Sequence, residues 1–302
     1  MNKWLFILAV LLIQACGNTS ENNSSTEEQE TLTEETTETQ TNPEAQEAPP
    51  APTQEPKPGE DYFGYYVGFF EGVEMNFDKD PVPFNKITIS IDSLSGDILY
   101  GHSVVAGNER LFSGQFVVAG DSITVVASEP GDDRYDGVFS FAIRPGENTL
   151  IGTWAANNKR LAVSSRQYQL DKKAFSYDPQ LELSEEVGWS NLYEKYPKYP
   201  DKSESLTEDV SKFNASTYEL KKEDVENMYQ GDLEVMRNAI YARHGYSFKN
   251  RKMRFIFDHE VEWYMPVSTD IRDQLTALEK KNIDLLKRYE QHAERYYDEF
   301  GR

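Results

Sequence analysis

Hydrophobic and polar residues alternate with a period of two over residues 62–170, the pattern of strands that bury one face. The alternation is clearest near the start of this stretch, where Ile87, Ile89 and Ile91 all fall on one side. Turn sequences rich in glycine, asparagine and proline interrupt it repeatedly. The pattern therefore predicts strands at 62–70, 86–92, 97–106, 109–118, 121–128, 136–143, 148–155 and 159–170.

These eight short strands, joined by tight turns, predict an antiparallel meander. Closure into a barrel would remove the exposed strand edges, and a two-layer sandwich is the alternative arrangement. Phe139, Phe141 and Trp154 should join the three isoleucines in the core, and glycines inside the strands favour a tightly curved sheet. A small barrel encloses a space that side chains can fill, so a packed interior is favoured over a ligand cavity.

An acidic loop is expected between two of the strands, with carboxylates at Glu129, Asp132, Asp133 and Asp136. Carboxylate oxygens are ligands of Ca²⁺, but this spacing differs from that of the known calcium-binding loops. We therefore interpret the segment as a solvated acidic hairpin. We predict neither a metal site nor a cofactor for the chain.

Beyond residue 217 the apolar spacing changes to three and four residues, which is typical of helices. Leu233, Met236 and Ile240 predict a short amphipathic helix, and the flanking residues mark its ends. Asp232 is expected to be the N-cap, and Gly245 the left-handed residue that ends the helix. The chain as a whole is thus predicted to be an α+β protein, an eight-stranded antiparallel barrel-like meander followed by a small helical module.

A last helix should begin at the capping box formed by Thr276 and Glu279. Its expected buried stripe consists of Leu278, Asn282, Leu285, Tyr289, Ala293, Tyr296 and Phe300. A buried amide needs hydrogen-bond partners, so we expect Asn282 to bond a helix end or the polar residues of the preceding helix.

Polar residues also recur along one edge of that preceding helix, at Arg237, Tyr241 and His244. Their spacing lets them reach the same neighbours. With Glu279 and Asn282 they form either a buried network that fixes the helix packing or a cluster that faces a ligand. We favour the network, in which Arg237 pairs with Glu279 or another carboxylate. Arg237→Ala should then lower the melting temperature of the helical module markedly.

The residues that carry chemistry do not indicate an enzyme. His244 could act as a base beside Glu279, but no serine, cysteine or metal-binding pair stands at a spacing typical of hydrolases. We therefore predict a non-catalytic protein with no catalytic residue.

The N-terminal residues predict a lipid-anchored protein. Lys3 precedes an apolar run at residues 4–13, which is too short to span a bilayer. The following Leu-Ile-Gln-Ala-Cys at residues 12–16 resembles a bacterial lipobox, and Cys16 is the only cysteine of the chain. We expect Cys16 to be lipidated after removal of residues 1–15, and to attach the protein to the outer membrane, on its surface or its periplasmic face.

The charge of the chain excludes one class of partner. Acidic residues number 52 and basic residues 31, a net charge of −21, and residues 17–60 alone hold eleven glutamates and one lysine. Such a chain has little positive charge to neutralise phosphates, so we expect no nucleic-acid partner. The polar, acidic and proline-rich composition of residues 16–60 predicts a solvated tether, because it has almost no apolar surface to bury.

The heptapeptide Ile-Tyr-Ala-Arg-His-Gly-Tyr at residues 240–246 resembles the signature of the YARHG domain, a small module of bacterial envelope proteins. The resemblance extends over residues 220–290 and implies no particular chemistry. The expected organisation is a signal peptide at 1–15, a tether at 16–60, a barrel-like domain at 61–175, a connector at 176–217 and a helical YARHG-like domain at 218–302.

The function expected from these features is non-catalytic binding or scaffolding of a cell-wall or other envelope component, at the cell surface or in the periplasm. One alternative is carriage of a small apolar ligand inside the barrel. Another is a cell-wall hydrolase or an accessory to one. A large lined cavity in the barrel would favour the carrier, whereas a fully packed barrel would favour the binding or scaffold protein.

Overall fold

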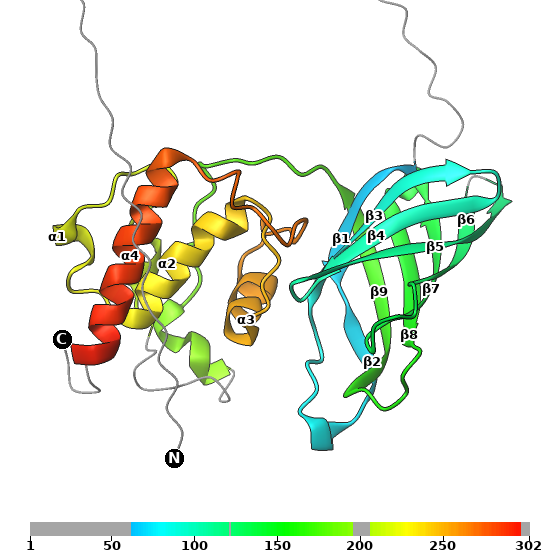
Figure 1. Ribbon diagram of the computed structural model, residues 1–302, viewed down its shortest axis with the longest axis horizontal. Helices are drawn as coiled ribbons and strands as arrows, with labels where there is room; N and C mark the ends of the chain where they lie inside the picture. Colours follow the sequence, from blue (N-terminus) through cyan, green and yellow to red (C-terminus); the bar gives the residue numbers. More distant parts are fainter. Residues whose placement is uncertain (1–61, 121, 196–205, 297–302) are drawn as a thin grey trace, which may run out of the picture. The chain divides into compact units, whose positions relative to one another are not determined.

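The computed structural model describes residues 62–120, 122–195 and 206–296, all within one compact unit that spans residues 54–302. The first part of this unit is an antiparallel sheet closed into a barrel, and the second part is helical (Figure 1). This is the α+β architecture that the sequence predicts. Within these described stretches, none of the helices is both long enough and apolar enough to cross a membrane.

The barrel is a meander in which sequence neighbours are also neighbours in the sheet. Its strands are β1 (Gly64–Phe69), β2 (Glu71–Met75), β3 (Lys86–Ser95), β4 (Ile98–Val105), β5 (Asn108–Ala119), β6 (Ser122–Ser128), β7 (Gly137–Arg144), β8 (Thr149–Ala156) and β9 (Val163–Lys173). β1 and β2 both pair with β9 and are separated only by Phe70, so together they act as one strand. The pairing of β1 with β9 closes an eight-stranded barrel, as predicted.

Most strand boundaries differ from the prediction by a residue or a few, and the differences at the first and the last strand have a clear structural cause. The first strand was expected to end at residue 70, but the chain continues as β2, which pairs with β9 up to Met75. The last strand was expected from residue 159, but it begins at Val163. A turn precedes it, because the backbone N–H of Leu161 donates to the carbonyl of Asn158 at 3.2 Å.

The inward faces of the strands form the barrel core. Alternation along β3 buries Ile87, Ile89 and Ile91, which are at most 1% exposed. The same alternation buries Phe139, Phe141 and Trp154, as predicted. Glycine allows the wall to curve: a Cβ on Gly114 would lie 2.0 Å from the carbonyl oxygen of Val126. β5 and β6 could not approach so closely with any other residue there.

The helical part is built on two long helices that pack against each other. Its helices are α1 (Lys222–Val225), α2 (Gln230–Arg243), α3 (Arg251–Glu260) and α4 (Ala277–Tyr296), and the 3-10 helices of the described chain are η2 (Phe77–Lys79), η3 (Pro145–Glu147), η4 (Trp189–Lys195) and η6 (Glu208–Ser211). α2 packs against α4 through Leu233, Met236 and Ile240, whose cluster also contains Ile283 and Leu286.

The start of α2 differs from the prediction, whereas its end agrees. The helix begins at Gln230, so Asp232 lies in the first turn and is fully buried rather than acting as the N-cap. Its carboxylate accepts hydrogen bonds from the backbone N–H and the hydroxyl of Thr207, both at 2.7 Å. Gly245 has a φ of +72°, the left-handed conformation expected just past a helix end.

The helix α3 was not predicted from the sequence. Phe255 and Phe257 stand two residues apart, a spacing that resembles a strand, and both are buried. The helix is started by Asn250, whose side chain accepts from the backbone N–H groups of Lys252 and Met253.

The helix α4 begins at the predicted capping box but is rotated relative to the predicted stripe. Glu279 N donates to Thr276 Oγ1, and Thr276 N donates to Glu279 Oε2. Tyr296 is 69% exposed, and Phe300 lies outside the described residues. Asn282 and Ala293 of the predicted stripe are buried and Leu285 and Tyr289 pack against the same cluster, but the buried face is completed by Glu279, Ile283 and Leu286, which the stripe did not include.

Candidate functional site

An open cleft of about 870 Å³ lies entirely within the helical part. Its walls are α2, α4 and the two segments 246–250 and 269–275, with Met253 of α3 at its edge. The residues that line it are Glu234, Arg237, Asn238, Tyr241, Tyr246, Phe248, Lys249, Asn250, Met253, Thr269, Asp270, Ile271, Arg272, Leu275, Lys280, Ile283, Asp284 and Lys287. A cleft of this size could hold a small molecule or a segment of another protein.

The cleft carries more positive than negative charge, in contrast to the chain. Five basic and three acidic residues line it, whereas the whole chain has a net charge of −21. Within the described residues, the ammonium groups of Lys249, Lys280 and Lys287 have no ion-pair partner. These three lysines are therefore available to an anionic group in the cleft.

Arg237 lies on the wall of this cleft and pairs with a carboxylate of α4. Its Nε is 2.5 Å from Glu290 Oε1 and its Nη2 is 2.9 Å from Glu290 Oε2, a two-point contact. Burial on its own lowers the pKa of Arg237, but the carboxylate of Glu290 outweighs that effect and raises the pKa above its usual value. Glu279, which the sequence suggested as a partner of Arg237, contacts His244 and not Arg237.

Aromatic side chains form the apolar part of the cleft wall. The ring of Tyr241 meets Tyr246 nearly edge to face at 6.1 Å, and Tyr246 meets Phe248 in the same way at 5.4 Å. The guanidinium carbon of Arg237 lies 5.9 Å from the centre of the Tyr241 ring. Tyr241 and Tyr246 remain partly exposed, so they offer both an apolar face and a hydroxyl to a bound group.

His244, the third residue of the predicted polar stripe, points into the protein instead of the cleft. Its Nε2 is 2.9 Å from Glu279 Oε2, and the two side chains are 2% and 0% exposed. Burial alone would raise the pKa of Glu279. The hydrogen bonds from His244, Thr276 and Ser216 outweigh it and hold that pKa at about 2.

Two further residues complete this buried cluster, and neither was proposed from the sequence. The hydroxyl of Tyr177 donates to Glu279 Oε1 at 3.0 Å, and its ring stacks on His244 at 4.1 Å. Arg243 is 2% exposed and donates from Nε to the carbonyl of Leu181 at 2.7 Å. Arg243 could have been proposed because it belongs to the heptapeptide at residues 240–246. The sequence around Tyr177 contains no pattern that would have indicated a role for it.

Asn282 is buried but does not contact Arg237, Tyr241 or His244. Its Oδ1 accepts from the backbone N–H of Leu220 at 3.0 Å. Its Nδ2 donates to the carbonyls of Ala215 and Tyr218 at 2.8 and 2.7 Å. The amide thus holds the backbone that leads into α1. The five residues proposed as one network therefore belong to three separate contacts: Arg237 and Tyr241 at the cleft, His244 with Glu279, and Asn282 with residues 215–220.

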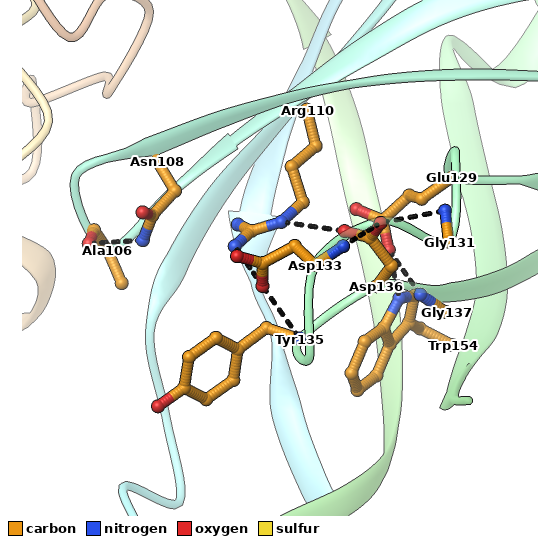
Figure 2. Close-up of polar contacts among 10 residues, drawn as sticks. All are labelled: Ala106, Asn108, Arg110, Glu129, Gly131, Asp133, Tyr135, Asp136, Gly137 and Trp154. Atoms are coloured by element: carbon orange, nitrogen blue, oxygen red, sulfur yellow. Dashed lines mark hydrogen bonds and ion pairs between the residues drawn. The ribbon is translucent and has the colours of Figure 1, made fainter. Parts of the chain in front are cut away.

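A second polar cluster lies in the barrel, at the acidic loop (Figure 2). Glu129 Oε2 accepts from Gly137 N at 2.7 Å and from Trp154 Nε1 at 3.0 Å. Asp136 accepts from Arg110 Nε at 3.1 Å and from two backbone N–H groups. Burial raises the pKa of Glu129, against the opposing effect of the Trp154 hydrogen bond.

The prediction of a solvated hairpin is therefore wrong for half of this loop. Asp132 and Asp133 are exposed, but Glu129 and Asp136 are 6% and 1% exposed. Burial is possible because the Trp154 indole, Arg110 and backbone N–H groups satisfy their oxygens. In the part of the chain that the structure describes, no group of three or more histidine, cysteine, aspartate or glutamate residues could hold a metal ion.

A family model for the YARHG domain matches residues 207–291. The cleft, the Arg237–Glu290 pair and the His244–Glu279 pair all lie inside this matched region. The YARHG domain indicates a periplasmic or extracellular protein-binding module. The comparison with curated proteins found no match. The predicted lipidation residue, Cys16, lies outside the described residues.

Proposed function

We propose that this chain is a lipid-anchored protein of the bacterial cell envelope that binds a partner protein non-catalytically through the cleft of its YARHG domain. The partner segment is acidic and carries an apolar side chain. Its carboxylates lie near the lysines at the rim, and its apolar side chain packs on the tyrosines of the wall. The observation that supports this most directly is a basic cleft in a strongly acidic chain.

The chemistry of the cleft wall supports an acidic peptide over a purely apolar one. Lys249, Lys280 and Lys287 surround a floor that contains Phe248 and Ile271. Opposite charges across an interface speed association and select the partner, while aromatic residues supply most of the binding energy. The arrangement of charged rim and aromatic floor is that of a protein-binding surface.

The burial of the His244–Glu279 pair supports binding over catalysis. A base that acts on a substrate must lie within hydrogen-bond reach of it. His244 is 2% exposed, and its ring is covered by Tyr177 at 4.1 Å. The pair is a structural contact in this proposal, which leaves the cleft as the surface for a partner.

Charge reversal in the cleft is expected to abolish most of the partner binding. We expect Lys280→Glu with Lys287→Glu to lower the affinity for the envelope partner about tenfold or more, because two rim charges would then repel an acidic segment. Purified Cys16→Ser protein and this double variant would be immobilised and exposed to envelope extract. The retained proteins would be quantified at low and high salt, and the binding to the parent protein should weaken as salt rises.

A matched control lies on the same helix. Lys281 and Arg288 have the same spacing, are exposed, and do not line the cleft. Lys281→Glu with Arg288→Glu changes the net charge by the same amount, so it should retain the partner. If both double variants lose the same proteins, net charge rather than the cleft determines binding, and the proposal is wrong.

The anchor is tested separately by Cys16→Ser. Cys16 is the only cysteine of the chain, so this change removes the only thiol that a lipid could modify. We expect the protein to move from the membrane fraction to the soluble fraction on cell fractionation, with loss of incorporation of a labelled fatty acid. Retention of the variant in membranes washed with high salt would overturn the lipoprotein assignment.

A further inference from the structure

One end of the barrel interior is hollow, although the rest is filled by side chains. A pocket of about 410 Å³ is lined by residues of β4, β5, β7, β8 and β9, by residues of the segments 80–85 and 161–162, and by Arg254 of α3. Phe70, Phe139 and Trp154 form its apolar wall, and all three are at most 6% exposed. The volume falls in the range of small-molecule sites, which extends from about 300 to 1,000 Å³.

Arg166 of β9 lies in this pocket without a carboxylate partner. The side chain is 8% exposed, and its guanidinium group donates to the carbonyls of Phe70, Val82 and Pro83, at 2.7, 3.0 and 3.4 Å. A guanidinium group has five N–H donors, so two remain without an acceptor among the described residues. A buried charge is normally paired, but no carboxylate among the described residues pairs with Arg166.

The other charged residues of the pocket do not neutralise Arg166. Arg110 is paired with Asp136 at 3.1 Å, and Asp80 with Arg251 at 2.6 Å. The other carboxylate of the lining, Glu129, accepts from Gly137 N and Trp154 Nε1 and forms no hydrogen bond or ion pair with Arg166. Burial and, to a smaller extent, the positive charge of Arg254, which lines the same pocket, together lower the pKa of Arg166 to about 10. The main charged influence on Arg166 is thus another cation, and the two carboxylates of the lining have other partners, which favours an anion beside Arg166.

Asn85 supplies a second group that lacks a partner. It is 5% exposed and lines the pocket, and its Oδ1 accepts no hydrogen bond from the described residues. It lies beside Arg166, because Phe70 donates its N–H to the Asn85 carbonyl at 2.8 Å and accepts from Arg166 with its own carbonyl. The pocket therefore presents unused cationic donors next to an unused amide acceptor.

We infer that this pocket binds the carboxyl-terminal apolar residue of a peptide, or an equivalent N-acyl amino acid. The carboxylate contacts Arg166, the adjacent N–H donates to Asn85 Oδ1, and the apolar side chain packs against Phe70, Phe139 and Trp154. This chemistry differs from that of the purely apolar ligand considered from the sequence. The site is separate from the cleft, so it does not depend on the function proposed for that cleft.

Three small probes test each part of this recognition on the full chain. N-acetyl-L-phenylalanine carries the carboxylate, the N–H and an apolar side chain. N-acetyl-L-phenylalaninamide lacks the carboxylate, and 3-phenylpropanoate lacks the N–H. Binding would be followed by the nuclear magnetic resonance signal of the Trp154 indole N–H, assigned with Trp154→Phe. We expect the Trp154 signal to shift at the lowest concentration with N-acetyl-L-phenylalanine. The amide lacks the contact with Arg166 and 3-phenylpropanoate lacks the hydrogen bond to Asn85, so each should bind about tenfold or more weakly.

Variants locate the two contacts. Arg166→Gln should lower the affinity for N-acetyl-L-phenylalanine about tenfold or more, whereas Arg144→Gln, an exposed barrel arginine paired with Glu147, should leave it unchanged. Asn85→Leu should remove the preference for N-acetyl-L-phenylalanine over 3-phenylpropanoate. If Arg166→Gln does not fold, the three probes on the unaltered chain still decide the question.

Two results would overturn the inference. One is equal affinity for the acid and the amide, which would show that Arg166 does not recognise a carboxylate. The other is the absence of a saturable shift at Trp154, including the case in which only Trp189 or Trp263 responds.

Discussion

Replacing Glu279 with alanine is expected to lower the free energy of unfolding of the helical part by about 3–5 kcal/mol, because three hydrogen-bond partners lose the carboxylate at a cost of about 1–3 kcal/mol each. The change leaves His244 buried without its carboxylate and removes the acceptor of the Tyr177 hydroxyl. It also removes the capping bond to the Thr276 backbone. Chemical denaturation followed by the fluorescence of Trp189 and Trp263, both in the helical part, measures the loss in a background that carries Trp4→Phe and Trp154→Phe.

The neighbouring exposed residue provides the control for this measurement. Lys280→Ala, also in the first turn of α4, should change the free energy of unfolding by less than about 0.5 kcal/mol. Glu279→Gln should fall between the two, because it keeps the shape of the side chain and a hydrogen-bond acceptor but loses the charge. A loss below about 1 kcal/mol for Glu279→Ala would contradict the structural role assigned to the pair.

The same residue predicts a dependence of stability on pH. The pKa of Glu279 is about 2 in the folded protein, below its ordinary value of 4.5. A carboxyl group with a depressed pKa stabilises the folded state fully above the unfolded-state value, and this contribution is lost as the pH falls through the folded-state value. The difference in stability between the unaltered protein and Glu279→Gln should therefore be constant above pH 4.5 and shrink as the pH approaches 2. If this difference in stability instead grows as the pH falls, the pKa of Glu279 is raised and not lowered by folding, and the prediction is wrong.

Replacing Asn282 with leucine should destabilise the helical part by about 3 kcal/mol or more. The side chain is fully buried, and its amide satisfies one backbone N–H and two backbone carbonyls of residues 215–220. Leucine has a similar size but leaves all three groups buried without partners, and each costs about 1–3 kcal/mol. Thermal and chemical unfolding would measure the loss.

A leucine at the preceding position is the matched control. Lys281 is exposed, so Lys281→Leu introduces the same side chain on the same helix without stranding a buried group. If Lys281→Leu and Asn282→Leu lower the stability equally, the hydrogen bonds of the amide are not what holds residues 215–220.

The barrel could be predicted from the sequence because strands with one buried face repeat every two residues. The side chains of Ile87, Ile89 and Ile91 must share a face of any strand, and that face must be covered. The same rule places Phe139 and Phe141 inward on β7. The C-terminal end of α2 and the start of α4 were predicted equally well, because Gly245 and the Thr276–Glu279 box act within a few residues of the chain.

The sites could not be predicted in the same way, since they depend on residues that are distant in the sequence. The stripe of Arg237, Tyr241 and His244 was identified, but its three members have different surroundings. His244 faces Glu279, while Arg237 faces Glu290, eleven residues further along the same helix. Both carboxylates lie near one face of α4, and only the packing of α4 on α2 determines which of them each cation meets.

The sequence by itself determined what is local: the period-two strands, the end of α2 and the start of α4, the acidic composition of residues 17–60 and the signature at residues 240–246. The tertiary structure alone decided which polar groups are buried, including Glu129, Arg166 and Asn282. It also decided which cations stay without a carboxylate. The physical reason is that periodicity and capping depend on neighbouring residues, whereas the burial and pairing of a charge depend on whichever distant segments surround it.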